Sequence, residues 1–249
     1  MKIAVCIKRV PDMEMRFSLA SDRKSLDPAG LKFEMGDFDG YALEVGLQLI
    51  EKQGGEVVLL SIGPDGVQET LRKGLAMGAG RAVQLKTEDV PFDGLAIARA
   101  LAAELKTGGY DLILFGRVAT DTANGTVGPM TAELLDLPCV TSISELDIAD
   151  GRGTARRELE GGAETMQFSL PAVLTIDEGI ARPRLASLKG IMAAKKKPLE
   201  VKPAQLGEPR LVVESMTLPP DRPPGRIVGE GADAVPELLR LLKTEAKVL

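Results

Sequence analysis

Residues 110–130 read YDLILFGRVATDTANGTVGPM, and this stretch decides the fold. Its first part, Tyr110–Gly116, is an apolar run that is typical of a fully buried strand. A loop rich in small and polar residues follows, and the apolar spacing over Pro129–Leu135 predicts a helix. A buried strand that leads through such a loop into a helix is typical of a parallel sheet, which binds ligands at the carboxyl ends of its strands.

Strand and helix signals alternate in the same way through the first half of the chain. This alternation predicts βαβ units and a mostly parallel, doubly wound sheet in an α/β fold. The strand order of such a sheet reverses at one point, and we expect the loops after Ile7, Ile62 and Gly116 to meet there. The other predicted elements are strands at Lys2–Ile7, Glu56–Ile62 and Ala82–Leu85, and helices at Tyr41–Lys52, at Val67–Met77, which Gly78 ends, and at Gly94–Leu105.

The pattern changes after Pro138, where short strand signals are separated by Gly-containing turns. These signals predict a β-meander followed by one more buried strand. The predicted strands are Val140–Ile148, Thr154–Leu159, Glu164–Ser169 and Ala172–Ile176.

The last part of the chain is rich in Pro and Lys. It predicts a short helix at Leu188–Ala194, an extended linker at Pro219–Pro224 and an amphipathic helix at Pro236–Val248. Its apolar residues are too few for a separate core, so it is expected either to be disordered or to lie on another protein, and the recurrence of apolar residues favours the second. Residues 1–184 are therefore predicted to form one α/β domain that includes the meander, and residues 185–249 a separate C-terminal arm.

The composition excludes several classes of function. The chain of 249 residues has no histidine, so it lacks the commonest general base and zinc ligand, and neither a catalytic residue nor a metal site is expected. A net charge of −5 and an aromatic content of 3% give no reason to expect nucleic-acid binding. The sequence shows neither a membrane-spanning run nor a signal peptide, so a cytoplasmic location without membrane insertion is expected. Cys6 and Cys139 lie in apolar runs and are expected to be buried thiols.

The loop after Gly116 is the first candidate site. Its Gly125–Gly128 segment would place free N–H groups at a helix N-terminus, where geometry and the helix dipole favour phosphate. The alternative is a solvated loop in which the glycines make turns and Thr126 caps the helix. The loop is neither a P-loop nor a GxGxxG fingerprint. Before the Tyr41 helix, Asp37 or Asp39 is predicted to be the cap, and this capping loop could also touch a purine or ribose.

Two charged stretches complete the candidates. Arg156–Glu160 alternates in sign, and its simplest interpretation is a solvated hairpin. Arg182–Arg184, Leu188 and Lys195–Lys197 form a solvated basic face, a membrane-surface segment or a docking segment for an acidic partner, with the leucine as its apolar anchor.

These stretches resemble the beta subunit of electron-transfer flavoproteins, in order along nearly the whole chain. The late signature is the most specific part of the resemblance because many residues occur at the family spacing. The matching segments are KRVPD at 8–12, GP at 63–64, ETLR at 69–72, AMGA at 76–79, LFGR at 114–117, Asp121, VGP at 127–129, RE at 157–158, GG at 161–162, ET at 164–165, LPAV at 170–173, Thr175, PR at 183–184, Leu188, IM at 191–192, Ala194 and KK at 195–196.

The resemblance implies a Rossmann-like, adenine-nucleotide-binding subunit that carries a structural AMP and pairs with an alpha subunit that holds most of the FAD. It also implies docking to acyl-CoA or other dehydrogenases and delivery of electrons to a quinone oxidoreductase, as in fatty acid beta-oxidation. By position, Glu158 would lie near the flavin-facing interface and Leu188 would anchor the recognition loop. The positive charges of Arg184 and Lys195 are expected to add electrostatic steering. The AMP pocket would comprise Cys6, Gly36, Asp37, Phe38, Asp39, Ile62, Gly116, Arg117, Asp121, Thr122, Ala123, Asn124, Gly125, Thr126 and Val127.

The chain departs from the family pattern at two places. It has Gly36-Asp37 where the family usually has Asn-Pro, and Thr126 where the family usually has Gln. Some family members bind a second FAD in this pocket and bifurcate electrons, and the 122–129 segment is similar to that branch too. A nucleotide-binding enzyme of the ATP type and an interaction subunit with an empty pocket are the remaining alternatives.

Overall fold

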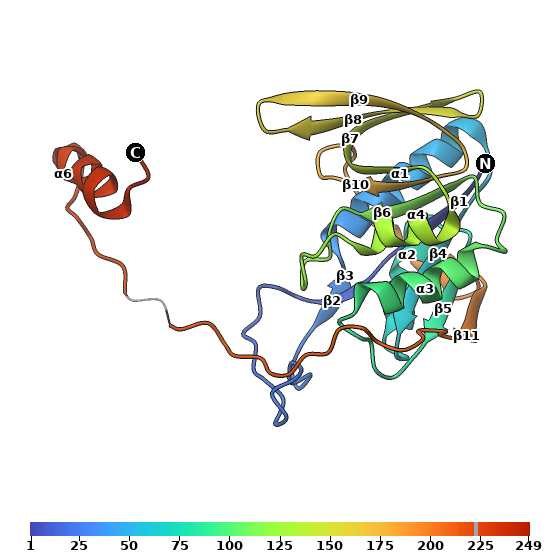
Figure 1. Cartoon of the computed structure of the whole chain (residues 1–249), viewed down its shortest axis with the longest axis horizontal. Helices are drawn as coiled ribbons and strands as arrows, with labels where there is room; N and C mark the ends of the chain where they lie inside the picture. Colours follow the sequence, from blue (N-terminus) through green and yellow to red (C-terminus); the bar gives the residue numbers. More distant parts are fainter. Residues whose placement is uncertain (222–223) are drawn as a thin grey trace. The chain divides into compact units, whose positions relative to one another are not determined.

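The computed structural model describes residues 1–221 and 224–249, which divide into two compact units, Met1–Met216 and Thr217–Leu249. The first unit is built on one large sheet with the strand order β11-β5-β4-β1-β6-β10-β7-β8-β9, and Figure 1 shows β9 and β11 at its opposite edges. The strands are β1 (Lys2–Cys6), β4 (Glu56–Gly63), β5 (Arg81–Lys86), β6 (Leu112–Gly116), β7 (Cys139–Ala149), β8 (Arg152–Leu159), β9 (Gly162–Ser169), β10 (Ala172–Ile176) and β11 (Leu199–Pro203).

The pairing from β11 to β7 is parallel, and only β8 and β9 add to the sheet in antiparallel register. Strands β4 and β5 follow β1 on one side, whereas β6 and β10 lie on its other side. The strand order therefore reverses between β1 and β6. The predicted α/β fold with a mostly parallel sheet and a β-meander is confirmed.

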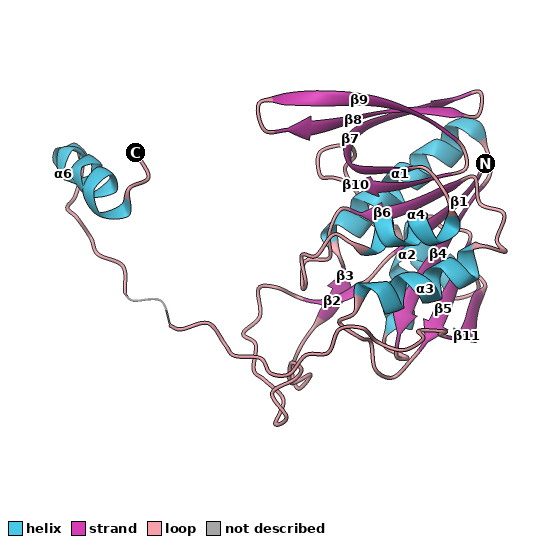
Figure 2. Ribbon diagram, viewed as in Figure 1, coloured by secondary structure: helices cyan, strands magenta, loops and turns pink. Residues whose placement is uncertain are grey.

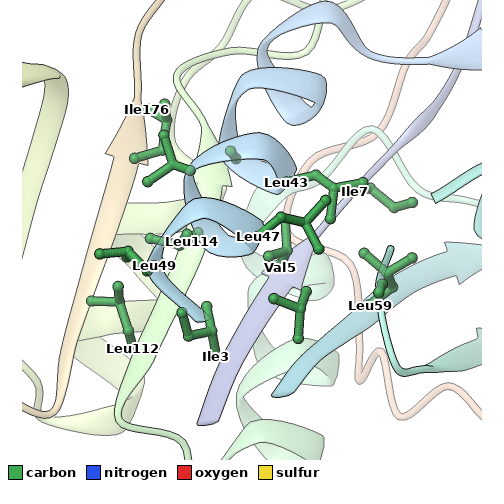
Figure 3. Close-up of a cluster of buried hydrophobic side chains, with 14 of the residues drawn as sticks. Ile3, Val5, Ile7, Leu43, Leu47, Leu49, Leu59, Leu112, Leu114 and Ile176 are labelled. Atoms are coloured by element: carbon green, nitrogen blue, oxygen red, sulfur yellow. The ribbon is translucent and has the colours of Figure 1, made fainter. Parts of the chain in front are cut away.

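Helices cover both faces of the sheet (Figure 2). The alternation of side chains along β1 shows how the two layers are formed, because Ile3 and Val5 face one cluster while Ala4 faces the other. Helices α1 (Asp37–Gln53) and α2 (Val67–Met77) pack on the first face, part of which is drawn in Figure 3, and α3 (Gly94–Leu105) and α4 (Val127–Leu135) pack on the second.

Helix α1 begins at Asp37, four residues before the predicted start at Tyr41. The prediction that Asp37 or Asp39 caps it is wrong: Gly36 is the N-cap residue, and no side chain of the described residues bonds to the first turn as a cap. Asp37 lies in the first turn, where a negative charge is favoured by the helix dipole, and the Asp39 carboxylate is bonded elsewhere. Helices α2 and α3 and strand β10 have the predicted bounds.

Segment 185–216, which the sequence predicts to be part of an arm, packs on the first unit. Helix α5 (Leu188–Ala194), with the predicted bounds, lies against α2, and β11 extends the sheet beside β5. Neither β11 nor the small antiparallel pair β2 (Arg9–Pro11) and β3 (Phe33–Met35) was predicted. All three are short strands whose partners are distant in sequence.

The second unit contains α6 (Val235–Leu241), which begins after a 3₁₀ turn at Ala232–Ala234 and continues as a π-helical turn at Leu242–Ala246. These segments correspond to the predicted C-terminal helix. Of the predicted linker Pro219–Pro224, residues 222 and 223 lie outside the described residues.

The two cysteines differ in their surroundings. Cys6 is buried, as predicted, but the prediction is wrong for Cys139, which is exposed. Cys139 is the first residue of β7, and the alternation of the strand turns the next residue, Val140, into the core instead. Among the described residues, no helix is long and apolar enough to cross a membrane.

The central strands should dominate the stability of the chain. Leu114 on β6 is fully buried, so the change Leu114→Ala removes buried methyl groups and leaves a cavity in the core. We expect the free energy of unfolding to fall by about 2–5 kcal/mol, measured by urea denaturation. Leu134→Ala on α4 is the matched control, because Leu134 is 44% exposed and its loss should cost less than about 1 kcal/mol. Equal losses in the two variants would contradict this assignment of the core.

Candidate functional site

A cavity of about 370 Å³ lies at the carboxyl edge of the sheet, where the strand order reverses. The loops after β1, β4 and β6 contribute to its wall, as the sequence predicts for the segments after Ile7, Ile62 and Gly116. Much of the remaining wall is apolar and includes Phe92 and Phe115. A largely apolar cavity with a limited number of placed polar groups is typical of a small-molecule site.

The N-terminus of α4 contributes backbone polar groups to the cavity wall. Val127 and Gly128 occupy the first two helical positions, whose N–H groups have no intrahelical acceptor. Thr126 is the N-cap residue, and its side chain makes no capping hydrogen bond to any described residue. The backbone N–H groups and the helix dipole at this end favour an anion.

The backbone of the same loop is held in an uncommon conformation. Ala123 has a φ of 51° and Gly125 a φ of 62°, both in the left-handed region. Glycine adopts this region freely, whereas for alanine it is strained and is often found at functional sites. Left-handed residues also turn neighbouring N–H groups toward a common point, which creates a concavity for anions.

Two glycines let helices approach the strand ends closely. A Cβ atom at Gly116 would lie 2.6 Å from Asp39 Oδ1, and a Cβ atom at Gly128 would lie 2.8 Å from the Thr175 side chain. The first close approach places the start of α1 against the end of β6, and the second places α4 against β10. Both glycines therefore shape the cavity by letting α1 and α4 pack closely on the strand ends that border it.

Asp39 joins the two strand ends that border the cavity. Its carboxylate accepts hydrogen bonds from the backbone N–H of Lys8 at 2.7 Å and from that of Gly116 at 3.2 Å. Burial raises the pKa of Asp39 to about 7, although these two hydrogen bonds favour the ionised form. Beside it, the Lys8 ammonium forms an ion pair of 2.7 Å with Asp121.

Two further cations contribute to the wall. Arg117 pairs with Asp177 at 3.3 Å and lies over the Phe38 ring, with its guanidinium carbon 4.9 Å from the ring centroid. Arg9 lies over the Phe33 ring at 3.5 Å from the centroid. Positive charge therefore borders the cavity on more than one side.

The structure brings most of the predicted pocket residues together. Asp37, Gly36, Phe38 and Ala123 lie outside the lining. The predicted residues that line the cavity are Cys6, Asp39, Ile62, Gly116, Arg117, Asp121, Thr122, Asn124, Gly125, Thr126 and Val127.

The loop after β5 also lines the cavity, and sequence reasoning missed it. Glu88, Val90, Pro91 and Phe92 belong to this loop. The same rule that selected the other loops could have found it, because β5 is parallel to β4 and its carboxyl end reaches the same edge of the sheet.

The residues predicted to meet partners lie outside the cavity wall. Glu158 on β8 has an exposed side chain that pairs with Arg156 at 3.2 Å. Leu188 begins α5 and is 84% exposed, and Lys195 at the other end of this helix is exposed as well. Arg184, in contrast, is bonded to carboxylates of α1.

Comparison with known proteins identifies the family. Residues 25–206 match the family model described as "Electron transfer flavoprotein domain". The chain is 37% identical to the electron transfer flavoprotein subunit beta of Bacillus subtilis over the full length of both chains. It is 37% identical to the human subunit of the same name, over 96% of each chain.

This chain belongs to the electron transfer flavoprotein beta-subunit family. The beta subunit of Syntrophomonas wolfei is a further relative, 36% identical over all of this chain and 98% of that protein. Membership connects the chain with electron transport and with flavin, and the term beta subunit implies an alpha subunit as its counterpart. The resemblance inferred from the sequence motifs is thus confirmed.

Asp39 gives the stability of the chain a specific pH dependence. Because the pKa of Asp39 is raised in the folded state from an ordinary 3.8 to about 7, its contribution is present below the ordinary value and is lost as the pH rises through about 7. We expect the Asp39→Asn variant not to lose stability in this way as the pH rises, because asparagine does not ionise. Asparagine also leaves one of the two backbone donors without an acceptor, which costs about 1–3 kcal/mol.

Urea denaturation at about pH 5 and about pH 8 measures both effects, since the two values lie on either side of the folded-state pKa. The variant should be less stable than the parent chain at both values, by a margin that narrows at the higher pH. Asp37→Asn, on the same helix but exposed, is the control for the loss of one carboxylate from this helix. A margin that widens with pH would contradict the raised pKa.

Proposed function

We propose that this chain is the beta subunit of a heterodimeric electron-transfer flavoprotein that accepts electrons from dehydrogenases and passes them toward the respiratory chain. In this proposal it acts as an electron carrier in the cytoplasm and performs no bond-making catalysis of its own. The single observation that supports it best is the cavity at the reversal point of the sheet, with the N-terminus of α4 in its wall, in a member of this family.

The proposed ligand of the cavity is AMP. The N–H groups of Val127 and Gly128 and the loop around Gly125 would hold its phosphate, and the apolar wall with Phe92 would receive the adenine. A volume of about 370 Å³ lies near the lower end of the range of about 300–1,000 Å³ for small-molecule sites, which favours a mononucleotide over FAD. AMP supplies no redox chemistry, and it would stabilise the folded state simply by binding to it.

The flavin is proposed to be FAD held mainly by an alpha subunit, where it supplies the reversible uptake of electrons. The beta subunit would contribute charge near the flavin-facing interface, and Glu158 is the proposed residue. Its carboxylate is exposed and its neighbour Arg156 also pairs with Glu145, so a partner surface can reach this charge from solvent. A carboxylate near a flavin tunes its potential through electrostatics.

Docking of dehydrogenases is proposed to depend on Leu188. This side chain is 84% exposed at the start of α5, and Lys195 at the end of the helix adds positive charge. An apolar anchor beside exposed cations suits a partner that has an acidic rim around an apolar pocket. Acyl-CoA or other dehydrogenases are the proposed donors, and a quinone oxidoreductase is the proposed acceptor.

The sequence predicts an arm at residues 185–249, but residues 185–216 pack on the first unit, so the arm of the proposed heterodimer would be the unit Thr217–Leu249. Helix α6 and its continuation leave Val235, Leu238 and Leu239 between 43% and 48% exposed. A helix with a half-exposed apolar side is suited to pack on another protein, and an alpha subunit is the proposed one.

The nucleotide proposal predicts the effect of one glycine substitution. Gly125→Ala places a Cβ atom in the left-handed region, 3.3 Å from the Arg117 carbonyl oxygen, and should distort the loop that holds the phosphate. Mass spectrometry of the denatured heterodimer should find about one AMP per parent protein and less than about a tenth of that in the variant, which corresponds to a loss of over 1.4 kcal/mol in binding.

Gly151→Ala is the matched control for the backbone strain. Gly151 also has a left-handed φ, of 74°, but lies in the β7–β8 turn with no described atom within 4 Å of an added Cβ. Its AMP content should equal that of the parent. FAD in place of AMP would support the bifurcating branch, turnover of ATP would support an enzyme, and an absence of any nucleotide would refute the site.

The docking proposal predicts a kinetic effect without a spectral one. Leu188→Ala removes the anchor, and we expect kcat/KM for reduction by a cognate dehydrogenase to fall about tenfold, as for the loss of roughly 1.5 kcal/mol of apolar contact. The absorption spectrum of the bound flavin should not change. Leu134→Ala, an exposed leucine on α4, is the control, and an equal effect of both changes would count against an anchor at Leu188.

A further inference from the structure

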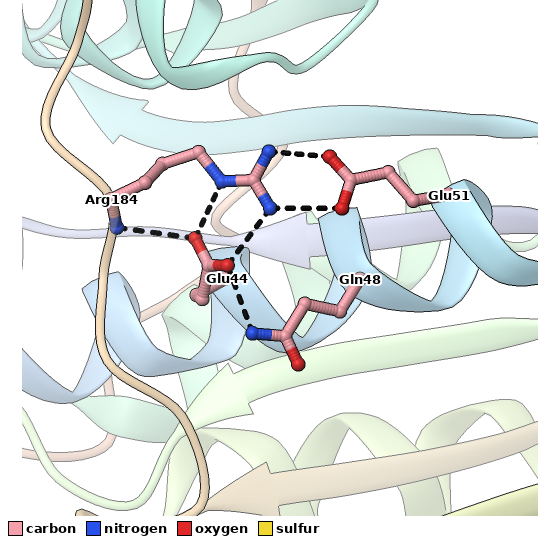
Figure 4. Close-up of polar contacts among 4 residues, drawn as sticks. All are labelled: Glu44, Gln48, Glu51 and Arg184. Carbon is pink, nitrogen blue, oxygen red and sulfur yellow. Dashed lines mark hydrogen bonds and ion pairs between the residues drawn. The ribbon is translucent and has the colours of Figure 1, made fainter.

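Arg184 is bonded to two carboxylates of α1 (Figure 4). Its Nε donates to Glu44 Oε2 at 2.8 Å, and its Nη2 donates to Glu44 Oε1 at 2.8 Å and to Glu51 Oε2 at 3.1 Å. The remaining Nη1 donates to Glu51 Oε1 at 2.5 Å, and the Arg184 backbone N–H donates to Glu44 Oε2 at 3.2 Å. The planar guanidinium thus uses its donors in a fixed geometry that lysine could not reproduce.

This network depends on a carboxylate that is itself buried. The Glu44 side chain is 5% exposed and accepts a further hydrogen bond from Gln48 at 3.0 Å. Although burial opposes its charge, the hydrogen bonds from Arg184 lower the pKa of Glu44 below its ordinary value. The one arginine faces the two negative charges of Glu44 and Glu51, so little positive charge at Arg184 remains to attract an acidic partner.

The segment that follows Arg184 is also fixed at its other end. Gly190 lies so close to the Ala76 carbonyl oxygen of α2 that no side chain could fit there. Arg72 on α2 donates to the Ala194 and Lys197 carbonyl oxygens at 2.6 and 2.7 Å. In return, the Lys197 ammonium donates to the carbonyl oxygens of Leu75 and Ala79. These bonds tie α5 to α2.

Between the two attachments the chain exposes apolar side chains. Leu185 is 95% exposed, Leu188 is 84% exposed and Met192 is 64% exposed. A segment that is held at both ends loses less conformational freedom when these side chains enter a partner's pocket. The arrangement therefore has the form of a pre-organised docking element.

We propose that Arg184 is a positioning residue that fixes Leu188 for docking through its bonds to Glu44 and Glu51. It acts on the partner through this leucine and not through its own charge. This inference rests on the proposed function, because it takes Leu188 as the anchor for a dehydrogenase.

The test uses the flavin-loaded heterodimer and two variants of the network. The double variant Arg184→Met with Glu44→Gln removes the charges of Arg184 and Glu44. No buried carboxylate is then left without a partner, so the fold is retained. Arg184→Lys keeps the charge but loses the planar fork. In both variants we expect the amides of residues 185–192 to exchange hydrogen about tenfold faster, and kcat/KM with the dehydrogenase to fall about tenfold in the double variant, as for roughly 1.4 kcal/mol of added ordering cost.

Arg184→Lys separates positioning from steering. Positioning predicts a lower kcat/KM and faster exchange, whereas steering by charge predicts parent values. If Arg184→Lys keeps both parent values, the proposal is overturned.

A double-mutant cycle with Leu188→Ala tests whether Arg184 acts through the leucine. Positioning predicts that the network change adds less than about twofold to the effect of Leu188→Ala, since the anchor is already gone; fully additive effects would overturn the proposal. If Leu188→Ala alone has no effect, docking through Leu188 fails, and the exchange data still decide whether Arg184 holds the segment.

Discussion

Strand β1 pairs in parallel with β4 on one side and with β6 on the other, and the rest of the molecule is arranged around this position. Val5 is opposite Leu59 in one neighbour and Leu114 in the other, so β1 is buried on both faces and along both edges. After β1 the chain continues to α1 on the first face of the sheet, whereas after β6 it continues to α4 on the second face. The loops diverge at this point, and the cavity is the space that they leave.

Asp39 closes this arrangement at the carboxyl edge. Burying the Asp39 carboxylate this completely costs free energy, and the raised pKa of Asp39 reflects that cost. The N–H groups of Lys8 and Gly116 lie beyond the hydrogen-bonded pairing of β1 with β6, because the two strands diverge there. The Asp39 carboxylate remains buried because it accepts a hydrogen bond from each of these groups. Asp39, which the sequence predicted as a possible helix cap, thus links the ends of β1 and β6 at the cavity.

Local sequence patterns predicted the elements whose side chains are buried periodically. They did not predict the features that depend on pairing between residues far apart in the sequence. The apolar runs of β4, β6 and β10 and the stripes of α2 and α3 have nearly the predicted bounds because each buries a continuous face. The role of Asp39, the strand β11 and the intramolecular bonds of Arg184 depend on residues between 31 and 140 positions away, or on a distant strand. Periodicity contains no information about such pairs. Motif resemblance placed most of the cavity residues because it carries the tertiary pattern of a family.

The surface around α5 shows how the same chain can combine fixed polar bonds with exposed apolar groups. A leucine that is 95% exposed gains nothing from folding, so its position must be maintained by its neighbours. Arg184 on one side, and Arg72 with Lys197 on the other, provide hydrogen bonds to charged groups, which are stronger than those between neutral groups. Because these bonds are made to helices of the first unit, their geometry is set by the same core that sets the cavity. The cavity and the exposed apolar segment are therefore formed on the same scaffold in two ways: loops that diverge create the cavity, and a segment held at both ends exposes the apolar side chains.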